Sequence, residues 1–146
     1  MEINSVNPPC SMGRRKLASP RTQLDRGNWI ENAIDVLAHD GVGGLRVEVL
    51  AKRCGVTKGS FYWHFKDRQD LLAAILEHWK EGRIRDIEKT TSVTPGKERE
   101  QLHFAIEVYG ASRNRKGMSI ELAVRDWARH DPQAATVVEA VDLYRL

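Results

Sequence analysis

The chain has 146 residues and a formal net charge of +3, a length that suits one core or two small helical units sharing a long helix. It contains no run of about 20 apolar residues and does not open with a charged segment followed by an apolar core. We therefore expect neither a membrane-spanning protein nor a secretory signal. Two cysteines, Cys10 and Cys54, are too few for a disulfide framework, which favours a reducing cytoplasm.

The positive charge is concentrated towards the start of the chain. Residues 1–66 contain ten Lys and Arg against six Asp and Glu, whereas residues 67–146 contain thirteen against fourteen. A local excess of cations is typical of a surface that displaces counterions from a phosphate backbone. An ordinary solvated surface is the other interpretation, because the excess is small.

Residues 1–25 predict a basic disordered arm. Prolines and a glycine interrupt any helical run there, and few apolar residues are available to bury. A basic arm that precedes a DNA-binding element can reach into a minor groove or lie along the phosphates. A plain disordered start or a misassigned initiation codon is the alternative.

A first helix is predicted from about Asn28 to Asp40, because apolar residues recur at helical spacing and Gly41 follows them. The repeating positions are Ile30, Ala33, Ile34 and Leu37. Residues 42–44 form a loop, and Leu45 is expected to anchor that loop on the core. We assign this part of the chain to core and loop, with no site residue.

The segment Val47–Phe65 predicts two short helices joined by a tight turn, the arrangement of a helix-turn-helix. Ala51 is small enough for two helices to cross closely, and Gly55 can adopt the positive φ that ends the first helix. Thr57 stands where the N-cap of the second helix is expected. The side chains that fill the angle between the helices are Leu50, Cys54, Val56 and Phe61.

Spacing sorts the second helix into a buried and an outward side. Phe61 and Phe65 share one face, since each residue advances about 100 degrees around a helix. The residues expected to face away from that stripe are Gly59, Ser60, Tyr62 and Trp63, with Lys58 and His64 at its edges. Packing aromatics of a small bundle are the alternative, but an exposed Trp beside Tyr, Ser and Lys is better explained by contact with DNA.

The uninterrupted segment Leu50–Leu72 resembles the TetR family of transcriptional regulators, in which it corresponds to helix 2, the recognition helix and the start of helix 4. The resemblance extends upstream through Trp29–Gly44 as helix 1 and its loop. It implies an all-α protein with a helix-turn-helix DNA-binding domain over residues 26–66 and a partial helical regulatory domain over residues 67–146. Arg46 departs from the family pattern, since many members have Thr or Ser there, and this weakens the cap while offering a phosphate contact.

The resemblance also implies a set of contacts with double-stranded DNA. Phosphate contacts are expected of Arg46, Tyr62, His64 and Lys66. Base contacts are expected of Thr57, Lys58, Gly59, Ser60 and Trp63. The sequence alone does not separate the two roles.

A long helix is predicted after Asp67, a natural N-cap with Asp70 in the third position. Its apolar stripe consists of Leu71, Leu72, Ile75, Leu76, Trp79, Ile84 and Ile87. Lys66, just before the helix, is placed to meet a phosphate with the help of the helix dipole. In the family this helix joins the DNA-binding head to the regulatory body, so that a shift of the body moves the recognition helices of a dimer.

After a break at residues 90–96, three more helices are predicted, from about Lys97 to Ser112, from about Met118 to His130, and from Asp131-Pro132 to the end. Their apolar faces hold Leu102, Ala105, Ile106 and Tyr109, then Leu122, Ala123 and Trp127, and last Ala135, Val137, Val138 and Val141. The aromatics expected around an inducer pocket are Trp79, Phe104, Tyr109 and Trp127. Ordinary core packing is the alternative for these four.

Catalysis is not expected. The five histidines are scattered one per element without metal-ligand spacing, and no nucleophile motif or phosphate-binding loop occurs. Asp and Glu fall at salt-bridge spacings along the helices. We therefore predict no enzyme, no metal and no cofactor.

The function favoured by these features is a cytoplasmic, nucleoid-associated repressor that binds a palindromic operator as a homodimer and responds to a small-molecule inducer. The alternative is a truncated interaction protein that binds DNA weakly and acts through heterodimers. Family members usually continue past the position of Leu146 with two helices that form the four-helix bundle of the dimer. A fragment, a truncated gene or a different dimer surface would each account for this end of the chain.

Overall fold

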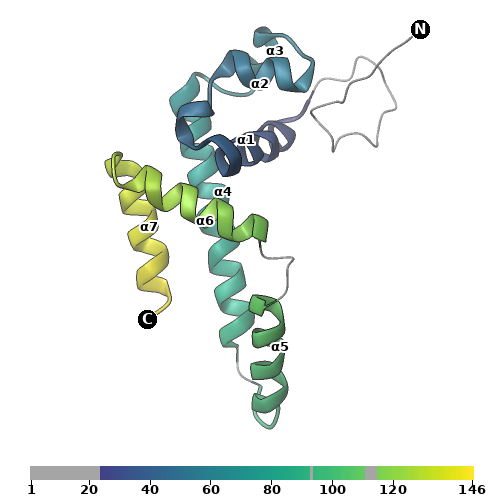
Figure 1. Cartoon of the computed structure of the whole chain (residues 1–146), viewed down its shortest axis with the longest axis vertical. Helices are drawn as coiled ribbons and strands as arrows, with labels where there is room; N and C mark the ends of the chain where they lie inside the picture. Colours follow the sequence, from purple (N-terminus) through teal and green to yellow (C-terminus); the bar gives the residue numbers. More distant parts are fainter. Residues whose placement is uncertain (1–23, 93, 111–114) are drawn as a thin grey trace, which may run out of the picture. The chain divides into compact units, whose positions relative to one another are not determined.

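The computed structural model describes residues 24–92, 94–110 and 115–146, with the side chains of residues 108–110 left out. Within these ranges the chain is entirely helical, which confirms the all-α prediction (Figure 1). The elements are α1 (Arg26–Asp40), the 3₁₀ turn η2 (Val42–Gly44), α2 (Val47–Cys54), α3 (Lys58–Tyr62), α4 (Arg68–Thr91), α5 (Glu98–Gly110), α6 (Arg115–Ala128) and α7 (Pro132–Tyr144). The predicted arm and Cys10 lie outside the described residues, apart from the last two positions of the arm.

The chain divides into two compact units, one up to Ala74 and one from Ile75 onwards. The boundary falls inside α4, so the first two turns of that helix belong to the first unit. The other regular elements in the described part of this unit are α1, η2, α2 and α3.

Helix α1 begins two residues before the predicted start because Asp25 caps it. The Asp25 carboxylate accepts a hydrogen bond of 2.7 Å from the backbone N–H of Asn28. Gly41 ends the helix as predicted, with φ of 73° and its N–H donating to the carbonyl of Leu37. Leu45 is fully buried, which confirms its role as the anchor of the loop.

An aromatic cluster forms the centre of the first unit. Trp29 of α1 meets Phe61 edge-on at 5.5 Å between ring centroids, and Phe65 stacks on Phe61 at 5.1 Å. The guanidinium of Arg26 lies 4.7 Å from the centroid of the Phe65 ring, in cation–π geometry. All three rings are at most 1% exposed.

The start of α4 carries the predicted cap. The Asp67 side chain accepts from the N–H of Asp70, and the Asp70 side chain accepts from the N–H of Lys66, both at 2.9 Å. These reciprocal bonds satisfy two N–H groups near the helix start. The predicted apolar stripe of the helix is buried except for Ile84, which is half-buried.

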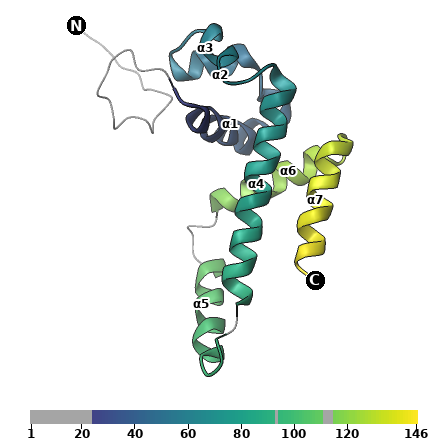
Figure 2. The same ribbon diagram turned by 180° about the vertical axis from the view of Figure 1, so that it is seen from behind.

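In the second unit, α6 and α7 pack against each other across a short turn (Figure 2). Helix α6 ends at Ala128, two residues before the predicted end, because residues 129–130 form the turn and Asp131 caps α7. The Asp131 carboxylate accepts from the N–H groups of Gln133 and Ala134, and its other oxygen accepts from the indole Nε1 of Trp127 at 3.0 Å. One carboxylate therefore joins the two helices, and Pro132 at the first position completes the predicted start.

Ion pairs connect α4, α6 and α7 within the second unit. Glu121 on α6 lies 3.2 Å from Arg83, 2.9 Å from Arg125 and 3.2 Å from Arg145. Arg125 also forms a forked pair with both oxygens of Asp142, at 3.0 and 2.6 Å. The forked pair lowers the pKa of Asp142. The sequence predicted salt bridges within helices, whereas several of these pairs join different helices.

The apolar face predicted on α5 is exposed at Leu102 and Ile106. Leu102 and Ile106 are each 63% exposed, and Leu122 on α6 is 64% exposed. Helical periodicity shows which residues share a face but not whether another element covers that face. The side chain of Tyr109 lies outside the described residues.

We predict that Asp131→Ala lowers the stability of the second unit by about 1 kcal/mol, since it removes a helix cap and the partner of the Trp127 indole. Thermal unfolding near pH 7 measures this loss. The exposed Asp126→Ala on α6 is the matched control and should leave the midpoint unchanged or slightly raised, because it removes a negative charge from the C-terminal turn of that helix.

The effect of Asp131 depends on pH. The hydrogen bond from Trp127 is the largest cause that lowers the pKa of Asp131 in the folded chain. A carboxyl whose folded pKa is depressed stabilises above its unfolded value, about 3.9, and loses that contribution as pH falls through the folded value. The difference between wild type and Asp131→Ala should therefore shrink under acid; a constant difference down to the lowest pH at which both fold would contradict this assignment.

Candidate nucleic-acid interface

The turn between α2 and α3 is built around Gly55. This residue has φ of 68° and ψ of 29°, in the left-handed region predicted from the sequence. Its N–H donates to the carbonyl of Lys52, and the N–H of Val56 donates to the carbonyl of Ala51. This pair of bonds is a Schellman motif, which ends α2 and redirects the chain. Leu50 and Ala51 are buried at the crossing, as predicted.

Helix α3 begins at the predicted cap. The Thr57 hydroxyl accepts a hydrogen bond of 3.3 Å from the N–H of Ser60. Although the helix as assigned ends at Tyr62, the N–H of Phe65 donates to the carbonyl of Phe61 at 3.0 Å, so helical hydrogen bonding continues to Phe65. Phe61 and Phe65 both face the core, which confirms the predicted buried stripe.

The burial of those two rings turns the intervening aromatics outward. Trp63 is 75% exposed and Tyr62 is 55% exposed. Thr57, Lys58 and Gly59 are exposed at the start of the same helix. Large aromatic side chains exposed at this level on a short helix are typical of a binding surface.

Ser60 is less accessible than the sequence predicted, whereas His64 lies at the edge of the buried stripe, where the sequence placed it. Both residues are half-buried, and Ser60 Oγ and His64 Nε2 have no hydrogen-bond partner in the described part of the chain. The two residues are four positions apart, so they share one flank of the helix beside the Phe61/Phe65 stripe. At this flank the side chains are partly covered instead of pointing fully outward.

Cationic side chains border the outward aromatics. Lys58 precedes them on α3, and Lys66 follows them before α4; both are exposed. Arg46 stands at the N-cap of α2, is exposed, and makes no side-chain bond to the helix end. Because Arg46 does not cap α2 with its side chain, as Thr or Ser would, its guanidinium is available to a partner outside the chain.

Arg68 is a residue of this region that the sequence analysis missed. Its Nε donates to the carbonyl of Leu45, and its Nη2 donates to the carbonyl of Val42 at 2.9 Å. These bonds span 23 and 26 residues of sequence, so no local pattern predicts them. An Arg in the first turn of a helix, where the dipole disfavours a cation, was the only available signal.

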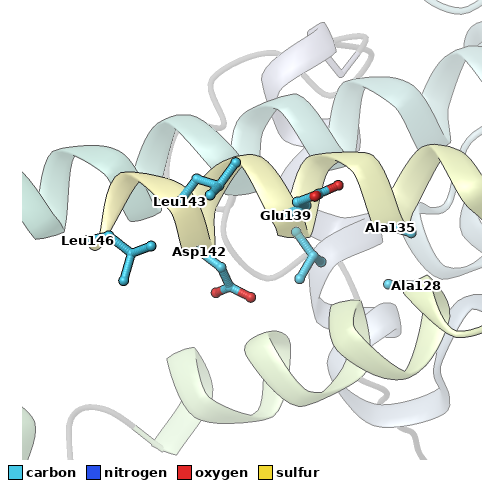
Figure 3. A pocket seen from close by; sticks show the side chains of 7 residues that line it. Ala128, Ala135, Glu139, Asp142, Leu143 and Leu146 are labelled. Atoms are coloured by element: carbon cyan, nitrogen blue, oxygen red, sulfur yellow. The ribbon is translucent and has the colours of Figure 1, made fainter.

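The second unit has an apolar hollow on α7 and the end of α6, with a volume of about 420 Å³ (Figure 3). It is lined by Ala128, Ala135, Val138, Glu139, Asp142, Leu143 and Leu146. Of the four predicted pocket aromatics, the three with described side chains, Trp79, Phe104 and Trp127, do not line it, and the side chain of Tyr109 lies outside the described residues. Trp79 and Trp127 are buried at 6% and 4% exposure, whereas Phe104 is 57% exposed.

The described residues contain neither a metal site nor a membrane-spanning helix. No group of three or more His, Cys, Asp or Glu is arranged there to hold a metal ion. None of the helices in those ranges combines the length and apolar character needed to cross a bilayer.

Comparison with known protein families finds a match in the segment that contains α2 and α3. Residues 30–75 match the family described as bacterial regulatory proteins, tetR family. The HTH-type transcriptional regulator AcrR of Shigella flexneri is 38% identical over 55 residues, which are 38% of this chain and 26% of that relative. The Tetracycline repressor protein class A from transposon 1721 of Escherichia coli is 41% identical over 56 residues, which are 38% of this chain and 26% of the relative.

A third relative, the uncharacterized HTH-type transcriptional regulator TtgW of Pseudomonas putida, is 36% identical over 65 residues, 44% of this chain and 47% of its own length. The matched region thus spans about a quarter to a half of these relatives. No solved structure matches the chain. The description of the matched family and the names of these relatives are those of regulatory proteins.

We predict that Gly55→Ala destabilises the first unit by roughly 1–2 kcal/mol, because a Cβ in the left-handed region meets the following carbonyl. Gly59→Ala is the matched control. Its added Cβ would meet only Thr57 Oγ1 at 3.7 Å, and alanine favours the helix by up to about 1 kcal/mol. Urea unfolding measures both variants, and equal losses would contradict the special role of the turn.

Proposed function

Because residues 30–75 form a helix-turn-helix domain of the tetR family of bacterial regulatory proteins, we propose that this protein is a sequence-specific DNA-binding repressor. The observation that carries the proposal is the outward pair Tyr62 and Trp63, placed between two exposed lysines by the buried Phe61/Phe65 stripe. An aromatic and cationic surface on a short helix after a tight turn suits a major groove and its phosphates.

The proposed docking places α3 in the major groove. Trp63 is the largest outward side chain and can contact base edges or a thymine methyl, while Thr57, Lys58 and Gly59 approach the bases from the first turn. Tyr62, Lys66 and Arg46 contact phosphates on the two sides of the groove. Ser60 and His64 complete the surface from the flank, where DNA would supply partners to their unpaired polar atoms.

In the proposed mechanism, one part of the chain binds DNA and the other part regulates that binding. We assign residues 26–66 to DNA binding and residues 67–146 to a regulatory domain, in a cytoplasmic protein associated with the nucleoid. A homodimer would present two recognition helices to a palindromic operator, and a small-molecule inducer bound in the regulatory domain would disfavour that spacing. The basic residues before 26 would add contacts to phosphate or to a minor groove.

The exposed apolar side chains of α5 and α6 favour a second candidate function. Leu102, Ile106 and Leu122 leave an apolar surface that a partner chain can cover. In this alternative the protein binds DNA weakly by itself and acts through heterodimers. Light-scattering mass with and without DNA distinguishes the two, because a homodimer on a palindrome has twice the protein mass of a lone chain.

The DNA contacts are tested on a duplex recovered by selection from a random-sequence library with the full chain. We expect Tyr62→Ala and Lys66→Ala to weaken binding to every duplex, because both contacts are to the backbone. For Lys66→Ala the slope of log affinity against log salt should fall by about 0.9, the value for one lost phosphate contact. Fluorescence anisotropy at several salt concentrations measures both quantities.

Lys89→Ala is the matched control, an exposed lysine in the last turn of α4 that belongs to the second unit. It should leave the affinity and the slope unchanged. Unchanged binding by both Tyr62→Ala and Lys66→Ala would show that the proposed docking is wrong. Selection that recovers no preferred sequence would overturn sequence-specific binding.

A further inference from the structure

The side chain of Arg68 connects two segments that are distant in sequence. Arg68 is the first residue of α4, and its half-buried guanidinium donates to the carbonyls of Val42 and Leu45. A guanidinium holds its N–H groups in a rigid fork, so two acceptors at this spacing fix its orientation as well as its position.

The acceptor side of this contact is held firmly. Leu45 has a fully buried side chain, and its N–H donates to the carbonyl of Val42 at 3.1 Å. Gly44, between the two acceptor residues, lies so close to α1 that a Cβ there would be 2.7 Å from the Cβ of Asp40. The loop and α1 therefore form one rigid support for the guanidinium.

The donor, Arg68, lies close in sequence to the proposed recognition helix α3. Only five residues separate the end of α3 at Tyr62 from Arg68, and Phe65 among them is 1% exposed. The bonds between Asp67, Asp70 and Lys66 hold the same connection. Fixing Arg68 to the loop thus fixes the point at which the chain leaves α3.

We propose that Arg68 is a positioning residue, a clamp that joins the first turn of α4 to the loop after α1 and so sets the orientation of α3 for DNA. The role rests on the proposed function. It differs from that of Lys66, since the N–H groups of Arg68 are directed at backbone carbonyls and those of Lys66 are free to meet a phosphate.

The charge-conserving variant Arg68→Lys separates a clamp from a phosphate contact. An ammonium group keeps the positive charge but cannot reproduce the fork. A clamp predicts that the affinity for the selected duplex falls by about tenfold while the salt slope stays at the wild-type value. A phosphate contact predicts nearly wild-type affinity, and that result would overturn the proposal.

Arg68→Gln and Lys66→Ala complete the comparison. For Arg68→Gln we expect weaker binding with little change of slope, whereas Lys66→Ala loses about 0.9 of the slope. A loss of about 0.9 for Arg68→Gln as well would show that Arg68 contacts phosphate, and the clamp would be rejected. A cooperative unfolding transition of Arg68→Lys with a midpoint well above the assay temperature establishes that the comparison concerns folded protein.

A measurement without DNA tests the clamp itself. Amide hydrogen exchange of the free chain should accelerate by about tenfold in Arg68→Lys at Leu45 and Leu71, which lie on the two sides of the contact. The amide of Gly41, bonded to the carbonyl of Leu37, is the internal control and should not change. Unchanged exchange at Leu45 and Leu71 would overturn the clamp.

The two measurements also separate this proposal from the proposed function. If selection recovers no duplex for the wild type, the repressor function fails and the orienting role fails with it, while hydrogen exchange still decides whether the clamp exists. If the wild type binds DNA, and Arg68→Lys matches the wild type in both DNA affinity and hydrogen exchange, the repressor function stands and the clamp is wrong.

Discussion

The burial of Phe61 and Phe65 is the constraint on which the geometry of the helix-turn-helix depends. Both rings are at most 1% exposed, and Trp29 closes the cluster from α1. Removing either ring from such a core costs roughly 3–5 kcal/mol. The helix therefore cannot rotate about its own axis, and Tyr62 and Trp63, between the two rings, have to face away from the core. Outward display of Tyr62 and Trp63 is a consequence of this packing.

The sequence predicted those features of the fold that arise within a few residues. Gly55, Thr57, Asp67 and Asp131 all act on groups at most five positions away, so their positions in the chain already identify the helix ends. The buried stripe of α3 was predictable for the same reason. The outward set was predicted less well, because Ser60, expected to face outward, is half-buried on one flank of the helix.

Contacts between distant segments were not predictable from one sequence. The bonds of Arg68 span 23 and 26 residues, and the pair between Arg125 and Asp142 spans 17. The exposure of the apolar face of α5 was unpredictable for the same reason, because it depends on segments distant in sequence. Leu102 and Ile106 repeat as in a buried helix, yet the periodic pattern does not show what covers them. The candidate site is therefore better predicted than its supports, because the site is local and the supports are not.

The exposure of Trp63 has an optical consequence. The chain has four tryptophans, of which Trp29, Trp79 and Trp127 are at most 6% exposed, whereas Trp63 is 75% exposed. Emission from the three buried indoles reports on the cores, and a water-soluble quencher reaches mainly the fourth. The end of α3 therefore carries a natural fluorescent reporter at its surface, so that occupation of this surface can be followed in the unlabelled protein.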